Sequence, residues 1–191
     1  GMFFCLILAT IRSFGSKISN NLVICYVTFF TNTPQLVQIY FLFFALPEFG
    51  ILLSPYIAVL LGMTLNAAAY LCEIQRAGFL SIRQNELDAA KTLNFTLVQQ
   101  VKYVILPHIM KVLFPPLSNH YIIMTLGTSM AAIFGVEELT GRAFNINSET
   151  FRSVEIFSIT ALIYIVITFI ATFLLAIIGR YFFKAKIRII Q

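Results

Sequence analysis

Long apolar runs alternate with short polar segments along most of this chain. Four of the runs are long enough to cross a bilayer, which takes about 20 mostly apolar residues in a helix. They cover residues 22–46, 51–76, 112–136 and 156–180. The pattern predicts an all-α fold, a polytopic membrane helix bundle that forms a single transmembrane domain over residues 1–191.

A further apolar run at residues 1–12 is about half as long as a membrane span. Its basic residue, Arg12, follows the apolar stretch, whereas a signal peptide carries its charge in front. We therefore expect residues 1–12 to be the end of a truncated first helix, whose missing part would add about ten apolar residues.

Prolines interrupt two of the four runs. Pro34 lies among polar residues within 22–46, and because proline lacks a backbone N–H, the helix should kink or restart there. Pro115 and Pro116 lie near the start of 112–136. They predict the end of one helix and the start of another.

The segment 86–107 is the one long stretch whose composition suits water. It carries several charges, and its apolar residues recur at steps of three and four, the spacing of one helix face. These apolar positions are Leu87, Ala90, Leu93, Leu97, Val98, Val101, Val104 and Ile105.

Local signals divide this amphipathic segment into two short helices. Asn85 can cap the first helix, and Asn94 suits a left-handed turn after it. Thr96 and Gln99 match the capping box of a second helix. Pro107 should stop that helix.

Composition agrees with a membrane protein. Apolar residues make up 59% of the chain and charged residues 11%, and the mean hydropathy is +0.89, far from an ordinary soluble domain. The net charge of +5 therefore indicates membrane sidedness, and we expect no nucleic-acid partner.

The basic residues fall mostly on one side of the predicted bundle, as the positive-inside rule requires of the cytoplasmic side. Only Arg142 and Arg152 lie on the other side. This orientation places residues 86–107 and the C-terminus in the cytoplasm. The cytoplasmic set is Arg12, Lys17, Arg76, Arg83, Lys91, Lys102, Lys111, Arg180, Lys184, Lys186 and Arg188.

No catalytic chemistry is evident in the sequence. The phosphate-binding pattern G-x-x-x-x-G-K-[ST] does not occur, so the chain should not bind and hydrolyse ATP by that route. His108 and His120 have no carboxylate set beside them in the sequence. Cys5, Cys25 and Cys72 lie in apolar runs without metal-ligand spacing. We expect no catalytic residue, metal or cofactor in this chain.

Landmarks in the amphipathic segment resemble those of a known family, the membrane subunits of ATP-binding-cassette (ABC) importers. In that family E-A-A, G and I-x-L-P mark a cytoplasmic coupling helix, which docks on a separate ATPase subunit. The resemblance implies an ATPase-coupling role for Glu86, Asp88, Ala89, Ala90, Asn94, Leu106 and Pro107. Asn94 replaces the family's Gly. The alternative is a helix that lies on the bilayer surface.

Further motifs are similar to those of polar amino-acid importers of the histidine and glutamine permease group. T-N-T-P-Q-L-V-Q from Thr31 resembles R-G-T-P-L-L-V-Q, and N-A-A-A-Y from Asn66 resembles N-S-A-A-Y. P-P-L-S-N from Pro115 and G-V-E-E-L-T from Gly135 resemble P-P-L-G-N and G-V-P-E-L-T. The resemblance implies a type I ABC importer fold in a bacterial inner membrane.

Seven polar residues are candidates for a translocation path: Asn66, Tyr70, Glu73, Asn119, His120, Thr128 and Ser129. Buried polar groups at membrane depth need partners, so hydrogen bonding to a neighbouring helix is the alternative for Asn66 and Tyr70. His120 can equally be a hydrogen-bonded part of the scaffold. Glu73 and Arg76 stand one turn apart and can pair with each other.

One departure from the family concerns the cargo. Where relatives often read K-D-T-S, this chain reads L-G-T-S from Leu126. The missing acidic residue makes arginine and lysine less favoured cargoes.

The sequence thus predicts a permease subunit that moves polar amino acids or similar small solutes. The resemblance implies two ABC ATPases that use ATP and Mg²⁺, a second permease subunit, identical or homologous, and an extracytoplasmic solute-binding protein, all within or against membrane lipid. Two other classes stay open at this stage. One is a secondary transporter or channel, which commonly shows internal repeats or intramembrane ion sites, and the other is a non-transporting scaffold.

Overall fold

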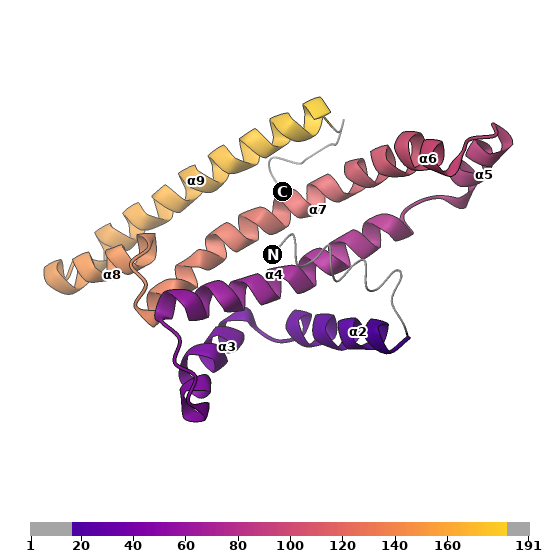
Figure 1. The fold of residues 1–191 in the computed structure, drawn as a ribbon. Helices are drawn as coiled ribbons and strands as arrows, with labels where there is room; N and C mark the ends of the chain where they lie inside the picture. Colours follow the sequence, from indigo (N-terminus) through magenta and orange to yellow (C-terminus); the bar gives the residue numbers. More distant parts are fainter. Residues whose placement is uncertain (1–16, 183–191) are drawn as a thin grey trace.

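The computed structural model describes residues 17–182, and every regular element in that range is helical (Figure 1). The predictions for residues 1–12 and for the basic residues after Arg180 lie outside the described range. The elements are α2 (Lys17–Thr31), α3 (Gln35–Tyr40), η1 (Phe41–Ala45), η2 (Leu46–Phe49), α4 (Pro55–Leu80), α5 (Gln84–Thr92), α6 (Leu97–Gln100), η3 (Val101–Ile105), α7 (Leu106–Gly127), η4 (Thr128–Phe134), α8 (Leu139–Thr150) and α9 (Ser153–Phe182).

Three long helices give the molecule its elongated shape. Helix α7 lies between α4 and α9, α2 packs on α4, and α8 folds back on α9 (Figure 1). Helices α5 and α6 form the far end of the molecule, beyond the tips of α4 and α9, whereas α3 and α8 lie toward the opposite end.

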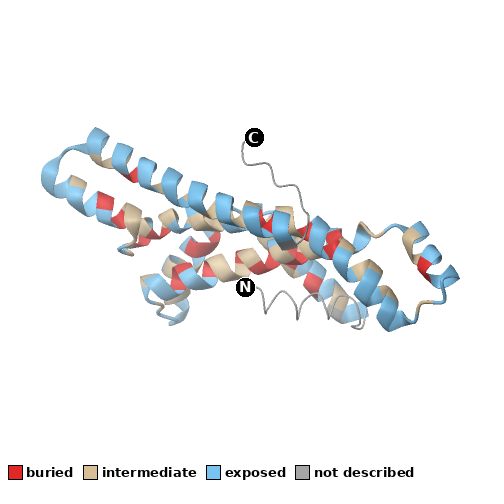
Figure 2. Cartoon of the chain, turned by 90° about the horizontal axis from the view of Figure 1, so that it is seen from above, coloured by how far each residue is buried: buried red, intermediate tan, exposed pale blue. Residues whose placement is uncertain are grey.

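Buried residues concentrate on α4, and α9 is largely exposed (Figure 2). Within the described residues, two helices are long and apolar enough by themselves to cross a membrane, Pro55–Leu80 and Ser153–Tyr181. The number rises to four if each of two bent helix pairs counts as one span. Although α9 packs against α7 and α8, many of its apolar side chains are exposed, which suits a helix surrounded by lipid or by another subunit.

The first bent pair restarts at Pro34, where the two parts differ in direction by 104°. The side chains just before the proline hydrogen-bond to the last carbonyls of α2: Thr31 Oγ1 to Val27 O at 2.8 Å, and Thr33 Oγ1 to Phe29 O at 2.8 Å. These bonds satisfy carbonyls that have no partner at a helix end. Of the two predicted outcomes, the structure shows a restart: the chain begins a new helix after Pro34 in a different direction.

The prediction that Pro115 and Pro116 separate two helices is wrong. Helix α7 continues through both prolines and belongs to an uninterrupted helical path from Leu97 to Phe134. Packing against α4 and α9 holds this path in place. Proline is tolerated inside membrane helices because neighbouring groups satisfy the freed backbone. Nearby, Ser118 Oγ donates to Phe114 O at 2.8 Å.

Small residues on α4 permit close helix packing. A Cβ atom at Gly62 would lie 2.6 Å from Ile39 Cγ1 on α3, and one at Gly78 would lie 2.4 Å from Leu113 Cδ2 on α7. Ile39 is fully buried. The glycines therefore set how near α3 and α7 approach α4.

Candidate functional site

The protruding segment consists of α5, a left-handed turn, and α6 continued by η3. Its predicted turn is confirmed, because Asn94 has φ 56°. The Phe95 N–H donates to Ala90 O at 3.0 Å and the Asn94 N–H to Lys91 O at 2.9 Å. These two bonds form a Schellman motif. Asn94 thus fills the position where the family landmark has Gly.

The start of α6 also follows the sequence. The Thr96 N–H donates to Gln99 Oε1 at 2.8 Å, and the Gln99 N–H donates to Thr96 Oγ1 at 3.3 Å. Both halves of the predicted capping box are therefore present.

Two boundary predictions for this segment are wrong. Helix α5 begins at Gln84 with Arg83 as its N-cap residue, so Asn85 lies inside the first turn and does not cap it. Pro107 does not stop a helix, because it lies in the first turn of α7, where its missing N–H costs little. The five residues before α7 widen into the π-helical segment η3, which keeps the path continuous.

The apolar residues of the segment do not pack together as one buried face. Ala90 is 3% exposed and is the only buried residue of α5. Leu93, Leu97 and Val98, on either side of the Asn94 turn, are 68%, 79% and 75% exposed. The tip of the segment therefore presents an uncovered apolar surface between polar helices, and we call these three residues the apolar tip.

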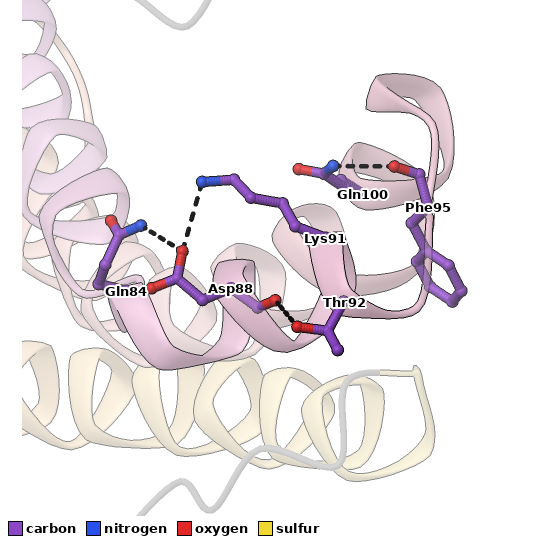
Figure 3. Close-up of polar contacts among 6 residues, drawn as sticks. All are labelled: Gln84, Asp88, Lys91, Thr92, Phe95 and Gln100. Atoms are coloured by element: carbon purple, nitrogen blue, oxygen red, sulfur yellow. Dashed lines mark hydrogen bonds and ion pairs between the residues drawn. The ribbon is translucent and has the colours of Figure 1, made fainter.

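The polar face of α5 is organised around Asp88 (Figure 3). Its Oδ1 accepts from Gln84 Nε2 at 3.0 Å and from Lys91 Nζ at 3.3 Å, while the Thr92 hydroxyl donates to its backbone carbonyl at 2.9 Å. The Gln84 hydrogen bond, and then that of Lys91, lower the pKa of the Asp88 carboxyl below its usual value. Asp88 is therefore an ionised, exposed group.

The residues of the predicted coupling set divide into two groups. Asp88, Ala89, Asn94, Leu106 and Pro107 are exposed. Ala90 and Glu86 face the chain itself: Ala90 is buried, and Glu86 Oε2 lies 3.5 Å from His108 Nδ1. Glu86 is therefore one carboxylate that lies beside His108 in space although it is distant in sequence, because the fold brings α5 back to α7.

Asn66 lies at the inner side of the helix break. It is 4% exposed, and its Nδ2 donates to Phe30 O and to Gln38 Oε1, each at 3.1 Å. Gln38 Nε2 in turn donates to Thr33 Oγ1 at 2.7 Å. For Asn66 the structure favours the alternative of hydrogen bonding to a neighbouring helix, since its amide bonds join α4 to both sides of the break.

Tyr70 and His120 form a second polar contact, between α4 and α7. Their rings stack with centroids 5.7 Å apart, and the Tyr70 hydroxyl donates to Thr31 O at 3.3 Å. Tyr70 is 39% exposed. His120 Nε2 is buried and has no hydrogen-bond partner among the described residues.

Of the other path candidates, Thr128, Ser129 and Glu73 have polar partners elsewhere along the chain. Asn119 and Thr128 are exposed, and the hydroxyls of Thr128 and Ser129 donate to carbonyls of their own helix, Thr125 O and Leu126 O. Glu73 forms the predicted pair with Arg76, with Oε2 2.7 Å from Arg76 Nη2. The carboxylate of Glu73 therefore has a partner on its own helix.

Sequence reasoning missed a polar junction at the opposite end of the molecule. Glu138 caps α8, because its carboxylate accepts from the Thr140 and Gly141 N–H groups at 2.9 and 2.8 Å. It also accepts from the Tyr164 hydroxyl of α9 at 2.9 Å. The G-V-E-E-L-T motif was the available signal, but its partner lies 26 residues away in sequence. Next to it, Glu137 pairs with Arg142 at 2.8 Å.

Comparison with known proteins gave matches to one family and to several of its members. The family described as "Binding-protein-dependent transport system inner membrane component" matches residues 1–184. The glutamine transport system permease protein of Escherichia coli (strain K12) is 35% identical over 171 residues, which cover 88% of this chain and 78% of that protein. A probable amino-acid ABC transporter permease protein of Vibrio harveyi is 37% identical over 161 residues, with coverage of 83% and 72%.

Two solved structures resemble the fold. The crystal structure of an amino acid ABC transporter with histidines superposes with a TM-score of 0.85 at 30% identity, covering 93% of this chain and 83% of that chain. An inward-facing methionine ABC transporter gives a TM-score of 0.68 at 17% identity. At that lower identity the second match concerns the fold alone.

Proposed function

Because this chain belongs to the family of binding-protein-dependent transport system inner membrane components, we propose that its cargo is a polar amino acid or a similar small solute. The chain is a membrane-spanning permease subunit of an ABC importer. Relatives named for glutamine and for general amino-acid transport support this cargo class. The uncharged L-G-T-S stretch from Leu126 favours an uncharged polar side chain over a cationic one.

The apolar tip is the observation that carries the proposed coupling to an ATPase. Leu93, Leu97 and Val98 are each at least 68% exposed, and polar residues such as Asp88, Lys91 and Gln99 flank them in the sequence. Exposed apolar side chains rimmed by polar groups are typical of protein interfaces. We assign the docking surface to this tip together with Asp88, Ala89 and Asn94.

The remaining parts of the assembly follow from the family. Two ATPase subunits, which bind ATP and Mg²⁺, would each dock on the protruding segment of one of two permease subunits. A solute-binding protein would deliver cargo at the opposite end, near α8. Arg83 is the N-cap residue of α5, Lys91 lies in its last turn, Lys17 begins α2 and Arg180 lies in the last turn of α9. The start of α2 and the end of α9 lie on the side of α5 and α6 (Figure 1), which supports a cytoplasmic C-terminus.

We assign the translocation path to the surface around Tyr70 and His120. Tyr70 is 39% exposed and its ring stacks on that of His120, so the exposed part of this pair can meet a polar group that passes. Asn119 directly precedes His120 in α7, and Thr128 and Ser129 lie farther along the same helical path, in η4. Asn66 and Glu73 would act at this path indirectly, through the helix break and the Arg76 pair.

The test is uptake by the complete complex in lipid vesicles, with ATPase subunits and the solute-binding protein present. We expect radiolabelled glutamine or another neutral polar amino acid to accumulate only when ATP is supplied. Uptake that proceeds without ATP would instead indicate a secondary transporter or channel. A complex that binds ATPase but moves no amino acid would contradict the proposed cargo.

A further inference from the structure

His108 connects three elements at the base of the protruding segment. It lies in the first turn of α7, its Nε2 reaches Ser81 at the end of α4, and its Nδ1 faces Glu86 of α5. The side chain of His108 is 23% exposed and that of Glu86 is 40% exposed. The Glu86–His108 contact is the one ion pair between α5 and the long helices in the described part of the chain.

The contacts with Ser81 fix which ring nitrogen of His108 carries a proton. Nε2 lies 3.1 Å from Ser81 O, which can only accept a hydrogen bond. It also lies 3.2 Å from Ser81 Oγ, whose own proton is donated to Gly78 O at 2.6 Å. Both oxygens therefore accept from His108, and Nε2 must carry the proton.

The contact that Nδ1 of His108 makes therefore differs between the neutral and the charged forms of the ring. A neutral imidazole carries one N–H only, so with Nε2 protonated, Nδ1 would present a lone pair to the Glu86 carboxylate. Only the imidazolium has a second N–H to offer Glu86 Oε2 at 3.5 Å. The contact between α5 and α7 is therefore attractive when His108 is charged and is lost when it is neutral.

Helices α5 and α7, which meet at this contact, each carry other charged groups near it. Arg83 precedes α5 as its N-cap residue, Lys111 lies one turn further along α7, and Asp88 and Lys91 pair with each other on α5. Within the described residues, Glu86 is the charged group that lies within ion-pair distance of His108. The contact therefore depends mainly on the charge of the histidine.

Few other interactions hold α5 against the membrane helices. Ala90 is its one buried residue, and the Asp88 carboxylate accepts hydrogen bonds from Gln84 and Lys91 of the same helix. A partner that pushes on α5 therefore acts on a helix whose polar attachment to the bundle is the Glu86–His108 pair. Loss of that pair should let α5 move without moving α7.

We propose that His108 is a positioning residue that ties the ATPase-docking helix α5 to α4 and α7 when it is protonated, so that coupling weakens as cytoplasmic pH rises. The inference rests on the proposed function. Histidine side chains change charge between about pH 5 and 8. Because the charged form makes the contact, the attachment is present at the lower end of that range and is lost toward the upper end.

The test compares the amino acid moved per ATP hydrolysed by the reconstituted complex at several cytoplasmic-side pH values. We expect this ratio to fall about two- to five-fold from low to high pH in the wild type, the range of a partly exposed ion pair. His108→Gln and Glu86→Gln should remove that pH dependence. Lys111→Gln, an exposed change on the same helix, should retain it.

A second measurement does not depend on transport. Hydrogen exchange of the α5 amides should be slower in the wild type than in Glu86→Gln at low pH, and the difference should vanish at high pH. Equal pH dependence of coupling in wild type, His108→Gln and Glu86→Gln would overturn the inference. Absence of ATP-driven uptake together with the expected exchange difference would overturn the proposed function but leave the attachment standing.

Discussion

The Tyr164 hydroxyl of α9 donates a hydrogen bond to the Glu138 carboxylate at the start of α8, across 2.9 Å. The same hydroxyl lies 2.9 Å from Thr140 Oγ1. Since Tyr164 donates to Glu138, the Thr140 hydroxyl can donate to Tyr164. Helices α8 and α9 are thus joined through one carboxylate, which also caps α8.

Replacing Tyr164 with Phe should destabilise the α8–α9 junction by about 1–2 kcal/mol, because a part-buried carboxylate loses one of its donors. Thermal unfolding of the purified complex would measure the loss. Tyr121→Phe is the matched control, since Tyr121 is 58% exposed and should show little change. Equal stability of the Tyr164→Phe and Tyr121→Phe variants would contradict the junction.

Replacing Asn66 with Ala should cost about 2–3 kcal/mol, since Phe30 O and Gln38 Oε1 each lose a donor in a buried setting. Thermal unfolding again reports the change. Asn119→Ala serves as a control for stability because Asn119 is exposed. Unchanged stability of Asn66→Ala would show that the helix break is held by Gln38 and Pro34 without α4.

Asn94 should tolerate Gly and reject β-branched residues. At φ 56° an ordinary side chain costs about 1–2 kcal/mol, whereas Gly costs nothing sterically. Hydrogen exchange of the α5 and α6 amides should be faster in Asn94→Val and the same or slower in Asn94→Gly. The opposite order would mean that the turn adopts another backbone conformation.

Polar substitutions in the apolar tip should weaken ATPase docking without unfolding the permease. Leu97→Ser and Val98→Ser remove side chains that are 79% and 75% exposed, so folding should be unaffected. Truncation of interface side chains commonly costs 1 kcal/mol or more each, and the double variant should bind the ATPase about tenfold more weakly. Binding of labelled ATPase to permease in nanodiscs measures this effect.

Ile146→Ser in α8 is the control for that experiment, since Ile146 is 51% exposed at the other end of the molecule. Undiminished docking of the Leu97→Ser, Val98→Ser double variant would remove the apolar tip from the interface. Asp88→Lys, or a bulky residue at Ala89, should also impair docking. Undiminished docking of either variant would remove that residue from the interface.

The contribution of Asp88 to docking should not depend on pH near neutrality. Its hydrogen bonds with Gln84 and Lys91 lower the pKa of the carboxyl, so any stabilisation is present above the ordinary aspartate pKa and is lost only as pH falls through the lowered value. Asp88→Asn should therefore change ATPase affinity by the same factor at pH 6 and pH 8. A factor that varies between these values would contradict this assignment.

Local signals in the sequence were sufficient where the structure depends on near neighbours. The Thr96–Gln99 capping box, the turn at Asn94 and the Glu73–Arg76 pair each join residues within five positions. Such contacts form within one helical turn or one tight turn, so spacing alone reveals them.

Local signals failed where packing or distant partners decide. Pro115 and Pro116 stay within α7 because neighbouring helices support it along its length, and no nearby residue indicates that support. Asn85 was a plausible cap, but the cap of α5 is Arg83, two residues earlier. The apolar spacing of residues 87–105 did not reveal which residues the rest of the chain covers.

The sequence by itself determined that this protein is a helical membrane protein with one polar, protruding segment, because hydropathy and charge fix which segments can leave water. Only the tertiary structure decided how its polar side chains pair. Glu138 meets Tyr164, Asn66 meets Gln38, and Glu86 meets His108 across separations of 22 to 28 residues. Such pairs depend on the direction in which each helix leaves its turn, and the sequence does not encode that direction in any short pattern.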